Sequence, residues 1–109
     1  LLASLELFSE VGMGRLRAKS EALTGLLDRA LRELFPEWVD VLTPADPARR
    51  GCQLSVRVKR DARTAHAALL ARGVVCDWRE PDVIRLAPVP FYNRFADILR
   101  CLEVFAQCL

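Results

Sequence analysis

The feature that most constrains the fold is an eight-residue stretch, Cys52 to Lys59, in which apolar and polar side chains alternate. Successive side chains of a β-strand point to opposite faces, so this pattern predicts a strand with one buried face and one solvent-exposed face. Such a strand is typical of an antiparallel sheet with one side open to water. The apolar set is Cys52, Leu54, Val56 and Val58, and the polar set is Gln53, Ser55, Arg57 and Lys59.

An amphipathic helix is predicted over residues 1–35. Leucines recur at spacings of three, four and seven along its second half, as they do on the buried face of a helix. Gly12 and Gly14 interrupt the pattern, and Pro36 ends it. Residues 1–12 start with neither a cap nor a turn, so we expect them to be the end of an interdomain helix.

Two further helices are predicted after the alternating strand. Asp61 can cap a helix over residues 62–72, and Gly73 can end it in the left-handed conformation. Asn93 can cap the last helix. The apolar stripe predicted for that last helix consists of Phe95, Ile98, Leu99, Leu102, Phe105, Ala106 and Leu109.

Three shorter strands complete the prediction. They cover residues 38–42, 74–77 and 83–87, and residues 79–82 form a turn between the last two. The element order is therefore αββαββα. We expect an α+β fold, in which a small, mostly antiparallel sheet of about four strands carries helices on one face. With 109 residues the chain has the length of one domain.

Composition and charge exclude several classes of function. Sixteen basic against fourteen acidic side chains leave a net charge of +2, so no nucleic-acid partner is expected. The apolar stretches are too short to cross a membrane and no signal peptide is visible, so no membrane partner is expected. The four cysteines form no CxxC pair and His66 is the one histidine. We therefore expect free buried thiols in a reducing cytoplasm, a half-buried or surface His66, and no metal site.

Arg85 is the one residue that points to a function. No phosphate-binding loop, nucleophile elbow or zinc motif is present, so no catalytic set is expected in this chain. Arg85 lies in an apolar strand, and alternation points it away from Ile84 and Leu86. A guanidinium on a rigid strand can bind a carboxylate through two parallel hydrogen bonds. Alternatively, Arg85 pairs with a local carboxylate such as Asp77 or Glu80; the residues alone leave both interpretations open.

Several blocks of the sequence are distinctive. They are SLELF at 4–8, GM at 12–13, LRAKS at 16–20, LTG at 23–25, RGCQL at 50–54, RGVVCDWREP at 72–81 and IRLAPVPFYN at 84–93. Together, and in this order, they resemble the C-terminal part of the kynureninase family over essentially the whole chain. Phe91 and Arg94 stand where the family usually has leucine and serine. Neither departure touches Arg85.

The resemblance implies a small C-terminal domain of a fold type I enzyme of aminotransferase class V. Such an enzyme uses pyridoxal phosphate to hydrolyse L-kynurenine or 3-hydroxykynurenine to anthranilate or 3-hydroxyanthranilate plus L-alanine. The family acts in tryptophan catabolism, the kynurenine pathway that leads to NAD biosynthesis, as a cytoplasmic homodimer. By the resemblance, Arg85 is the arginine that binds the substrate α-carboxylate.

The resemblance also implies a large cofactor-binding domain that this chain lacks. Neither Lys19 nor Lys59 matches the family's Schiff-base lysine, so we expect no cofactor-binding residue here and an inactive chain when it stands alone. An apolar patch around Leu1, Leu5 and Phe8 is expected to pack on the large domain. Two alternatives remain: a stand-alone ligand-binding or interaction domain, or part of another class V enzyme such as a cysteine desulfurase-like protein.

Overall fold

The alternating stretch forms the second strand of a four-stranded sheet. In the computed structural model of the chain, which describes residues 2–108, this strand is β2 (Leu54–Val58). Leu54, Val56 and Val58 are each at most 1% exposed, whereas Arg57 is exposed. The predicted assignment of the two faces is therefore confirmed, except that Cys52 precedes the strand and is half-buried.

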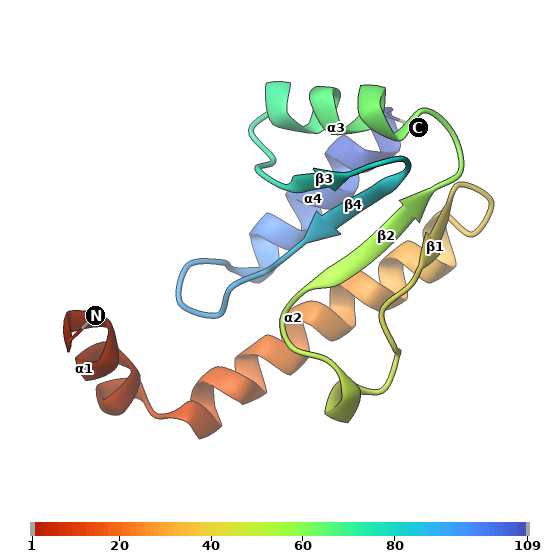
Figure 1. The fold of residues 1–109 in the computed structure, drawn as a ribbon. Coiled ribbons are helices and arrows are strands. Elements are labelled where there is room, and N and C mark those ends of the chain that lie inside the picture. Colours follow the sequence, from red (N-terminus) through yellow and green to blue (C-terminus); the bar gives the residue numbers. More distant parts are fainter. Residues whose placement is uncertain (1, 109) are drawn as a thin grey trace.

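The chain folds as helices on one face of an antiparallel sheet (Figure 1). The strands lie in the order β1-β2-β4-β3, and each neighbouring pair is antiparallel. The α-helices are α1 (Leu2–Val11), α2 (Met13–Leu34), α3 (Ala62–Ala71) and α4 (Phe95–Cys108); the other strands are β1 (Val39–Val41), β3 (Asp77–Arg79) and β4 (Val83–Leu86); a 3₁₀ turn spans Pro47–Arg49. The predicted α+β class is confirmed, with the first helix divided in two.

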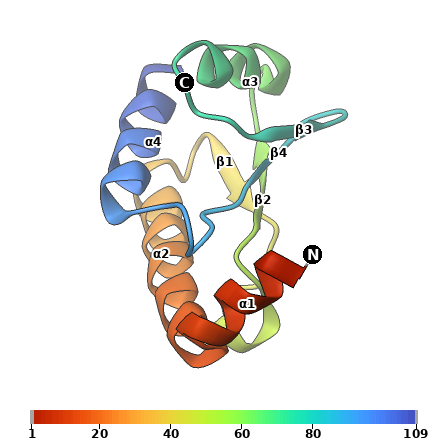
Figure 2. The same ribbon diagram turned by 90° about the vertical axis from the view of Figure 1, so that its left-hand side faces the viewer.

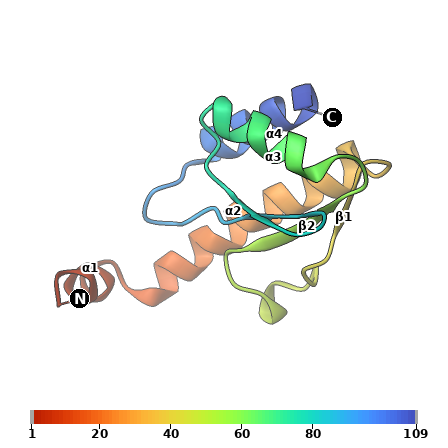
Figure 3. The same cartoon turned by 45° about the horizontal axis from the view of Figure 1, so that its top comes forward.

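The long helix α2 and the last helix α4 lie on the same side of the sheet, as Figure 2 shows. Helix α3 packs beside α4 above the same face (Figure 3). The largest fully buried side chains come from both layers, and they form one core. Its principal members are Leu23, Leu27, Leu31, Leu54, Val56, Leu69, Ile84, Ile98, Val104 and Phe105. The opposite face of the sheet carries no helix among residues 2–108 (Figure 2).

The predicted helix boundaries follow from local backbone chemistry. Gly12 has φ +90° and separates α1 from α2, and Gly73 has φ +86° just after α3. Both values lie in the region that side chains with a Cβ rarely adopt. Asp61 caps α3, because its carboxylate accepts a hydrogen bond from the Thr64 backbone N–H at 3.1 Å. The predictions for Gly12, Asp61 and Gly73 are confirmed. The prediction that Gly14 also interrupts the first helix is wrong, since Gly14 lies within α2.

The third strand was predicted at residues 74–77, which is wrong. The strand is Asp77–Arg79, so Arg79 belongs to β3 and the turn occupies residues 80–82. Val74 instead closes α3, since its N–H donates to the Leu69 carbonyl. Val75 is 89% exposed. The apolar run therefore carries the chain from helix to sheet, and pairing with β4 decides where the strand begins.

The start of α4 also differs from its prediction. The amide oxygen of Asn93 accepts from the Val89 N–H at 2.7 Å, so it braces the preceding loop rather than capping the helix. The carboxylate of Asp97 accepts from the Arg94 N–H at 2.8 Å and satisfies the first turn instead. On the predicted stripe Phe95, Leu99 and Ala106 are exposed, because the helix turns Val104 inward beside Ile98, Leu102 and Phe105. Leu109 lies outside the described residues.

A buried ion pair that was not predicted from the sequence joins α2 to the loop after β1. Asp28 contacts Arg50 at 2.8 Å, and both side chains are at most 5% exposed. Arg32, one helical turn after Asp28, binds the second carboxylate oxygen at 2.6 Å. Ser20, Thr24 and Asp28 recur every four residues beside the buried leucines, a spacing that could have revealed the polar ridge.

No helix within residues 2–108 is long and apolar enough to cross a membrane.

Candidate functional site

Arg85 lies on an inner strand of the sheet. Strand β4 is paired with β2 on one side and β3 on the other, so its backbone is fixed from both directions. Ile84 and Leu86 are at most 4% exposed on the helix-covered face. Arg85 points to the opposite face, where its side chain keeps 31% of its surface exposed. The predicted orientation toward the open face is confirmed.

Arg85 sits between two polar side chains in a row across the sheet. The register places Ser55 of β2 on one side of it and Asp77 of β3 on the other. Nη2 of Arg85 donates a hydrogen bond to Oδ2 of Asp77. The local partner that the sequence left open is thus Asp77. Arg85 itself lies on an inner strand, since β3 forms the edge of the sheet.

The guanidinium of Arg85 keeps unused hydrogen-bonding capacity. Its Nε is buried and has no acceptor among the described residues. Five N–H donors belong to each guanidinium, and a carboxylate takes two of them in a bidentate pair. Asp77 therefore does not use all the N–H donors of Arg85.

Asp77 serves two cations at once. Its Oδ2 also lies 3.3 Å from an Nη2 of Arg79. The hydrogen bond from Arg85 lowers the pKa of Asp77 below its ordinary value, aided by the positive charges of Arg79 and Arg85, while desolvation opposes the shift. The carboxylate is therefore ionised at neutral pH, and the three side chains together carry one net positive charge.

Other charges on the open side are locally paired. Arg57 lies 3.4 Å from Asp82, and Lys59 lies 3.4 Å from Asp40. All four side chains are well exposed, so water screens these pairs strongly. Together with Asp77, Arg79 and Arg85, they make this face a polar surface. Arg85 is the least exposed of these cations.

The residues described here do not fit a pyridoxal phosphate site. Lys19 donates to the Pro90 carbonyl at 2.6 Å, and Lys59 donates to the Pro36 carbonyl at 3.3 Å and pairs with Asp40. Both lysines therefore have partners within the fold. Within residues 2–108 there is also no cluster of His, Cys, Asp or Glu that could hold a metal ion.

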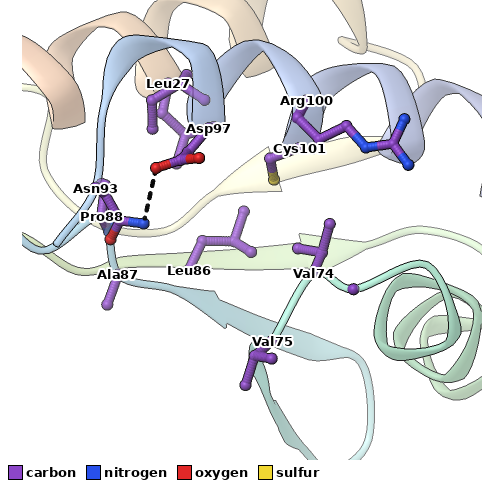
Figure 4. A pocket seen from close by; sticks show the side chains of 12 residues that line it. Leu27, Val74, Val75, Leu86, Ala87, Pro88, Asn93, Asp97, Arg100 and Cys101 are labelled. Carbon is purple, nitrogen blue, oxygen red and sulfur yellow. Dashed lines mark hydrogen bonds between the residues drawn. The ribbon is translucent and has the colours of Figure 1, made fainter.

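A pocket of about 330 Å³ opens on the helix side of the sheet. In Figure 4, Asp97 and Cys101 of α4 face Leu86 and Val74 across it. Leu86 points away from Arg85 by strand alternation, so the pocket and the arginine lie on different sides of the sheet. The pocket is therefore not part of the candidate carboxylate site.

The remaining sequence candidates have structural positions. His66 is half-buried as predicted, with Nε2 3.0 Å from the Cys76 carbonyl oxygen. The four cysteines are free, but each is half-buried rather than fully buried. Burial raises the pKa of Cys76 and of Cys101 to about 11, so both are neutral thiols at physiological pH.

Helix α1 presents an apolar surface. None of its described residues is buried, and Leu5 and Phe8 are 53% and 39% exposed. Phe8 contacts the ring of Phe91 edge-to-face at 4.9 Å between centroids. The expected surplus apolar patch is present at these positions, whereas Leu1 lies outside the described residues.

Comparison with known proteins identifies the family. The sequence profile of the kynureninase C-terminal domain matches residues 16–105. The chain belongs to the kynureninase C-terminal domain family. A kynureninase of Xanthomonas campestris pv. campestris (strain B100) is 54% identical to it over 106 residues, which is 94% of this chain and 25% of the relative. One of Xanthomonas oryzae pv. oryzae (strain PXO99A) is 55% identical over 101 residues, 90% of this chain and 24% of the relative.

This chain thus spans about a quarter of the length of the curated kynureninases that it matches. The match extends over the whole candidate site, because Ser55, Asp77, Arg79 and Arg85 all lie within residues 16–105. It follows that the chain is part of an enzyme, of which a larger part lies in other residues. Sequence reasoning found Arg85 and named Asp77, but it missed Ser55 and Arg79, which the sheet register brings beside them.

Proposed function

We propose that this chain is the part of a kynureninase that binds the α-carboxylate of the substrate through Arg85. The observation that carries the proposal is an inner-strand guanidinium on the open face that keeps 31% of its side-chain surface exposed. A carboxylate bound to this guanidinium would accept two parallel hydrogen bonds from its N–H groups. Each charge-assisted hydrogen bond of this kind contributes about 1.5–3 kcal/mol.

The substrate on this proposal is L-kynurenine or 3-hydroxykynurenine, and the products are anthranilate or 3-hydroxyanthranilate and L-alanine. The enzyme would act in tryptophan catabolism, in the cytoplasm and as a homodimer. Pyridoxal phosphate would be held by the larger part of the protein, since both lysines of this chain have other partners. The role of this domain is to hold one end of the substrate, so that the bond to be cleaved is correctly oriented.

The test of the proposal is a pair of substitutions in the complete enzyme. Arg85→Ala should lower kcat/KM for kynurenine by about a hundredfold or more, because it removes a bidentate charged contact. Arg85→Lys should recover part of that loss, since it keeps the charge but not the forked geometry. Cofactor absorbance and the melting temperature should stay close to those of the parent enzyme. Full activity of Arg85→Ala, or loss of activity through unfolding alone, would refute the assignment.

The apolar surface of α1 also belongs to this proposal. We expect the larger part of the enzyme to cover Leu5 and Phe8, whose exposure is unusual for a free surface. The 109-residue chain by itself should then be inactive and should self-associate. Size-exclusion chromatography should show association that Leu5→Glu together with Phe8→Glu abolishes. A monodisperse monomer at high concentration would favour the alternative, a stand-alone ligand-binding domain.

A part of another class V enzyme is the remaining alternative, and substrate choice distinguishes it. A kynureninase should release anthranilate or its 3-hydroxy derivative from an aryl amino ketone. A cysteine desulfurase-like enzyme should instead release sulfur from cysteine. Parallel assays of the complete enzyme on both substrates separate the two proposals.

A further inference from the structure

Asp77 is placed to control the direction of the Arg85 guanidinium. The two residues are directly opposite each other in the pairing of β3 with β4, and both project to the open face. Side chains opposite each other in an antiparallel pair are close enough to interact directly. The contact joins Nη2 of Arg85 to Oδ2 of Asp77, so Asp77 holds the guanidinium at one nitrogen and leaves its other N–H groups unused.

A free arginine side chain has many rotamers, and fixing it costs conformational entropy. A partner that fixes the guanidinium before the ligand arrives removes this cost from binding. Asp77 can act in this way because it lies on a paired strand rather than on a loop. Its ionised state, which Arg85 and Arg79 favour, keeps the contact strong at neutral pH.

We propose that Asp77 is a positioning residue that holds Arg85 in the orientation that binds the substrate carboxylate; this rests on the proposed function of Arg85. Asp77 does not act on the substrate itself. It sets the direction of the donors that do.

The charges around Asp77 explain why it does not simply block the arginine. Oδ2 is shared between Arg85 and Arg79, and Arg79 is 62% exposed. Two guanidinium groups against one carboxylate leave a positive surplus, so an incoming carboxylate is still attracted. Arg79 therefore offsets the repulsion that Asp77 would otherwise exert on the substrate.

The experiment compares two competitive inhibitors of the complete enzyme. One is a non-cleavable kynurenine analogue with its α-carboxylate, and the other is the same molecule without that carboxylate. The inhibition constant of the decarboxylated molecule divided by that of the carboxylated one measures carboxylate recognition alone, and this ratio falls when the carboxylate is bound less well. Asp77→Ala should weaken the carboxylated inhibitor by about tenfold to a hundredfold, as expected for a misplaced binding group. The decarboxylated inhibitor should change by less than about twofold, because it makes no contact with Arg85.

Asp77→Asn provides a variant closer to the native shape. Its amide oxygen can still accept from Arg85, but a neutral acceptor forms a bond about half as strong. The ratio should therefore fall severalfold, between the values for the parent and Asp77→Ala. If Asp77→Ala does not fold, Asp77→Asn decides, and an unchanged ratio in it overturns the proposal.

Asp82→Ala is the matched control. Asp82 is an aspartate that pairs with an arginine of the adjacent strand, Arg57, at 3.4 Å. Its loss should leave both inhibitors unaffected. Equal weakening of both inhibitors in Asp77→Ala would mean a general structural role, and tighter binding of the carboxylated one would mean that Asp77 competes with the substrate. Either result overturns the proposal.

Arg85→Ala separates the role of Arg85 from that of Asp77. If Arg85→Ala leaves the inhibitor ratio unchanged, the proposed function of Arg85 fails, and the role of Asp77 fails with it. If Arg85→Ala lowers the ratio while Asp77→Ala does not, Arg85 binds the carboxylate and the positioning role alone is wrong.

Discussion

Strand β4 places Ile84 and Leu86 on one face of the sheet and Arg85 on the other. On the covered face, α2, α3 and α4 bury apolar side chains with almost no exposed surface. On the open face, the same strands carry charged side chains in pairs that water reaches. One period-two pattern therefore supplies both the packing of the covered face and the direction of the side chains on the open face. Packing on the covered face fixes the backbone, and the fixed backbone sets where the side chains of the open face point.

Charge occurs on both sides of the sheet, but under different conditions. Asp28 and Arg50 are at most 5% exposed, whereas the pairs around Arg57 and Lys59 on the open face are well exposed. A buried charge that loses its partner is left without either protein or water to solvate it. An exposed charge that loses its partner recovers its hydration.

The largest expected effect follows from this difference. Asp28→Ala should lower the free energy of unfolding by about 3–5 kcal/mol, because it leaves the buried Arg50 without its carboxylate partner. Lys59→Ala, which breaks an exposed pair with Asp40, should change it by less than about 1 kcal/mol. Urea denaturation of the 109-residue chain measures both. Equal effects of the two substitutions would contradict the expected difference between the buried and the exposed ion pair.

The next effect concerns apolar packing. Ile84→Ala should lower the free energy of unfolding by about 2–5 kcal/mol, since Ile84 is fully buried under the helices. Ser55→Ala, on the open face of the adjacent strand, should change it by about 0.5 kcal/mol or less. Urea midpoints at constant slope give the two values. A large loss with Ser55→Ala would show that the open face also stabilises the fold.

A smaller effect is expected in the reactivity of the covered thiols. Because burial raises the pKa of Cys76 and Cys101 from 9.0 to about 11, their thiolate fraction at pH 8 is about a hundredfold lower than that of an ordinary cysteine. Alkylation by iodoacetamide, followed by peptide mass mapping, should therefore be slow at both sites and should accelerate as the pH approaches 11. Rapid modification at pH 8 would mean that the covered side admits water.

The smallest effect is an acid sensitivity at the start of α3. The hydrogen bonds from Thr64 lower the pKa of Asp61 below its ordinary 3.8. A carboxyl group whose pKa is lower in the folded state stabilises the fold above its unfolded pKa, and the contribution disappears as the pH falls through the folded pKa. Wild-type stability should therefore decline below about pH 4 more steeply than that of Asp61→Asn. Thermal melting between pH 2 and pH 6 compares them, and parallel curves would exclude this contribution.

The parts of the fold that were predictable are those that local chemistry decides. The alternation over residues 52–59 identified the buried face of β2, and Asp61 and Gly73 marked the two ends of α3. The direction of Arg85 followed from alternation as well. In each case the deciding atoms lie within a few residues of each other, so one sequence is sufficient.

The parts that were missed depend on distant partners. Val74 and Val75 have strand propensity, but the strand begins at Asp77 because only there does β4 supply hydrogen-bonding partners. Asn93 is a good cap by type, yet the Val89 N–H competes for its amide oxygen. The Arg50 partner of Asp28 lies 22 residues away along the chain. The kinship with kynureninases came from the sequence blocks, not from periodicity.

The inner position of β4 has an evolutionary consequence. Arg85 faces the open side only while β4 keeps its register against both β2 and β3. A deletion of one residue between β3 and β4 that shifted the pairing by one position would exchange the two faces, and would bury the guanidinium in place of Ile84. The 80–82 turn should therefore keep its length in this lineage. Substrate recognition on this sheet can then change by point substitution, but not by insertion or deletion.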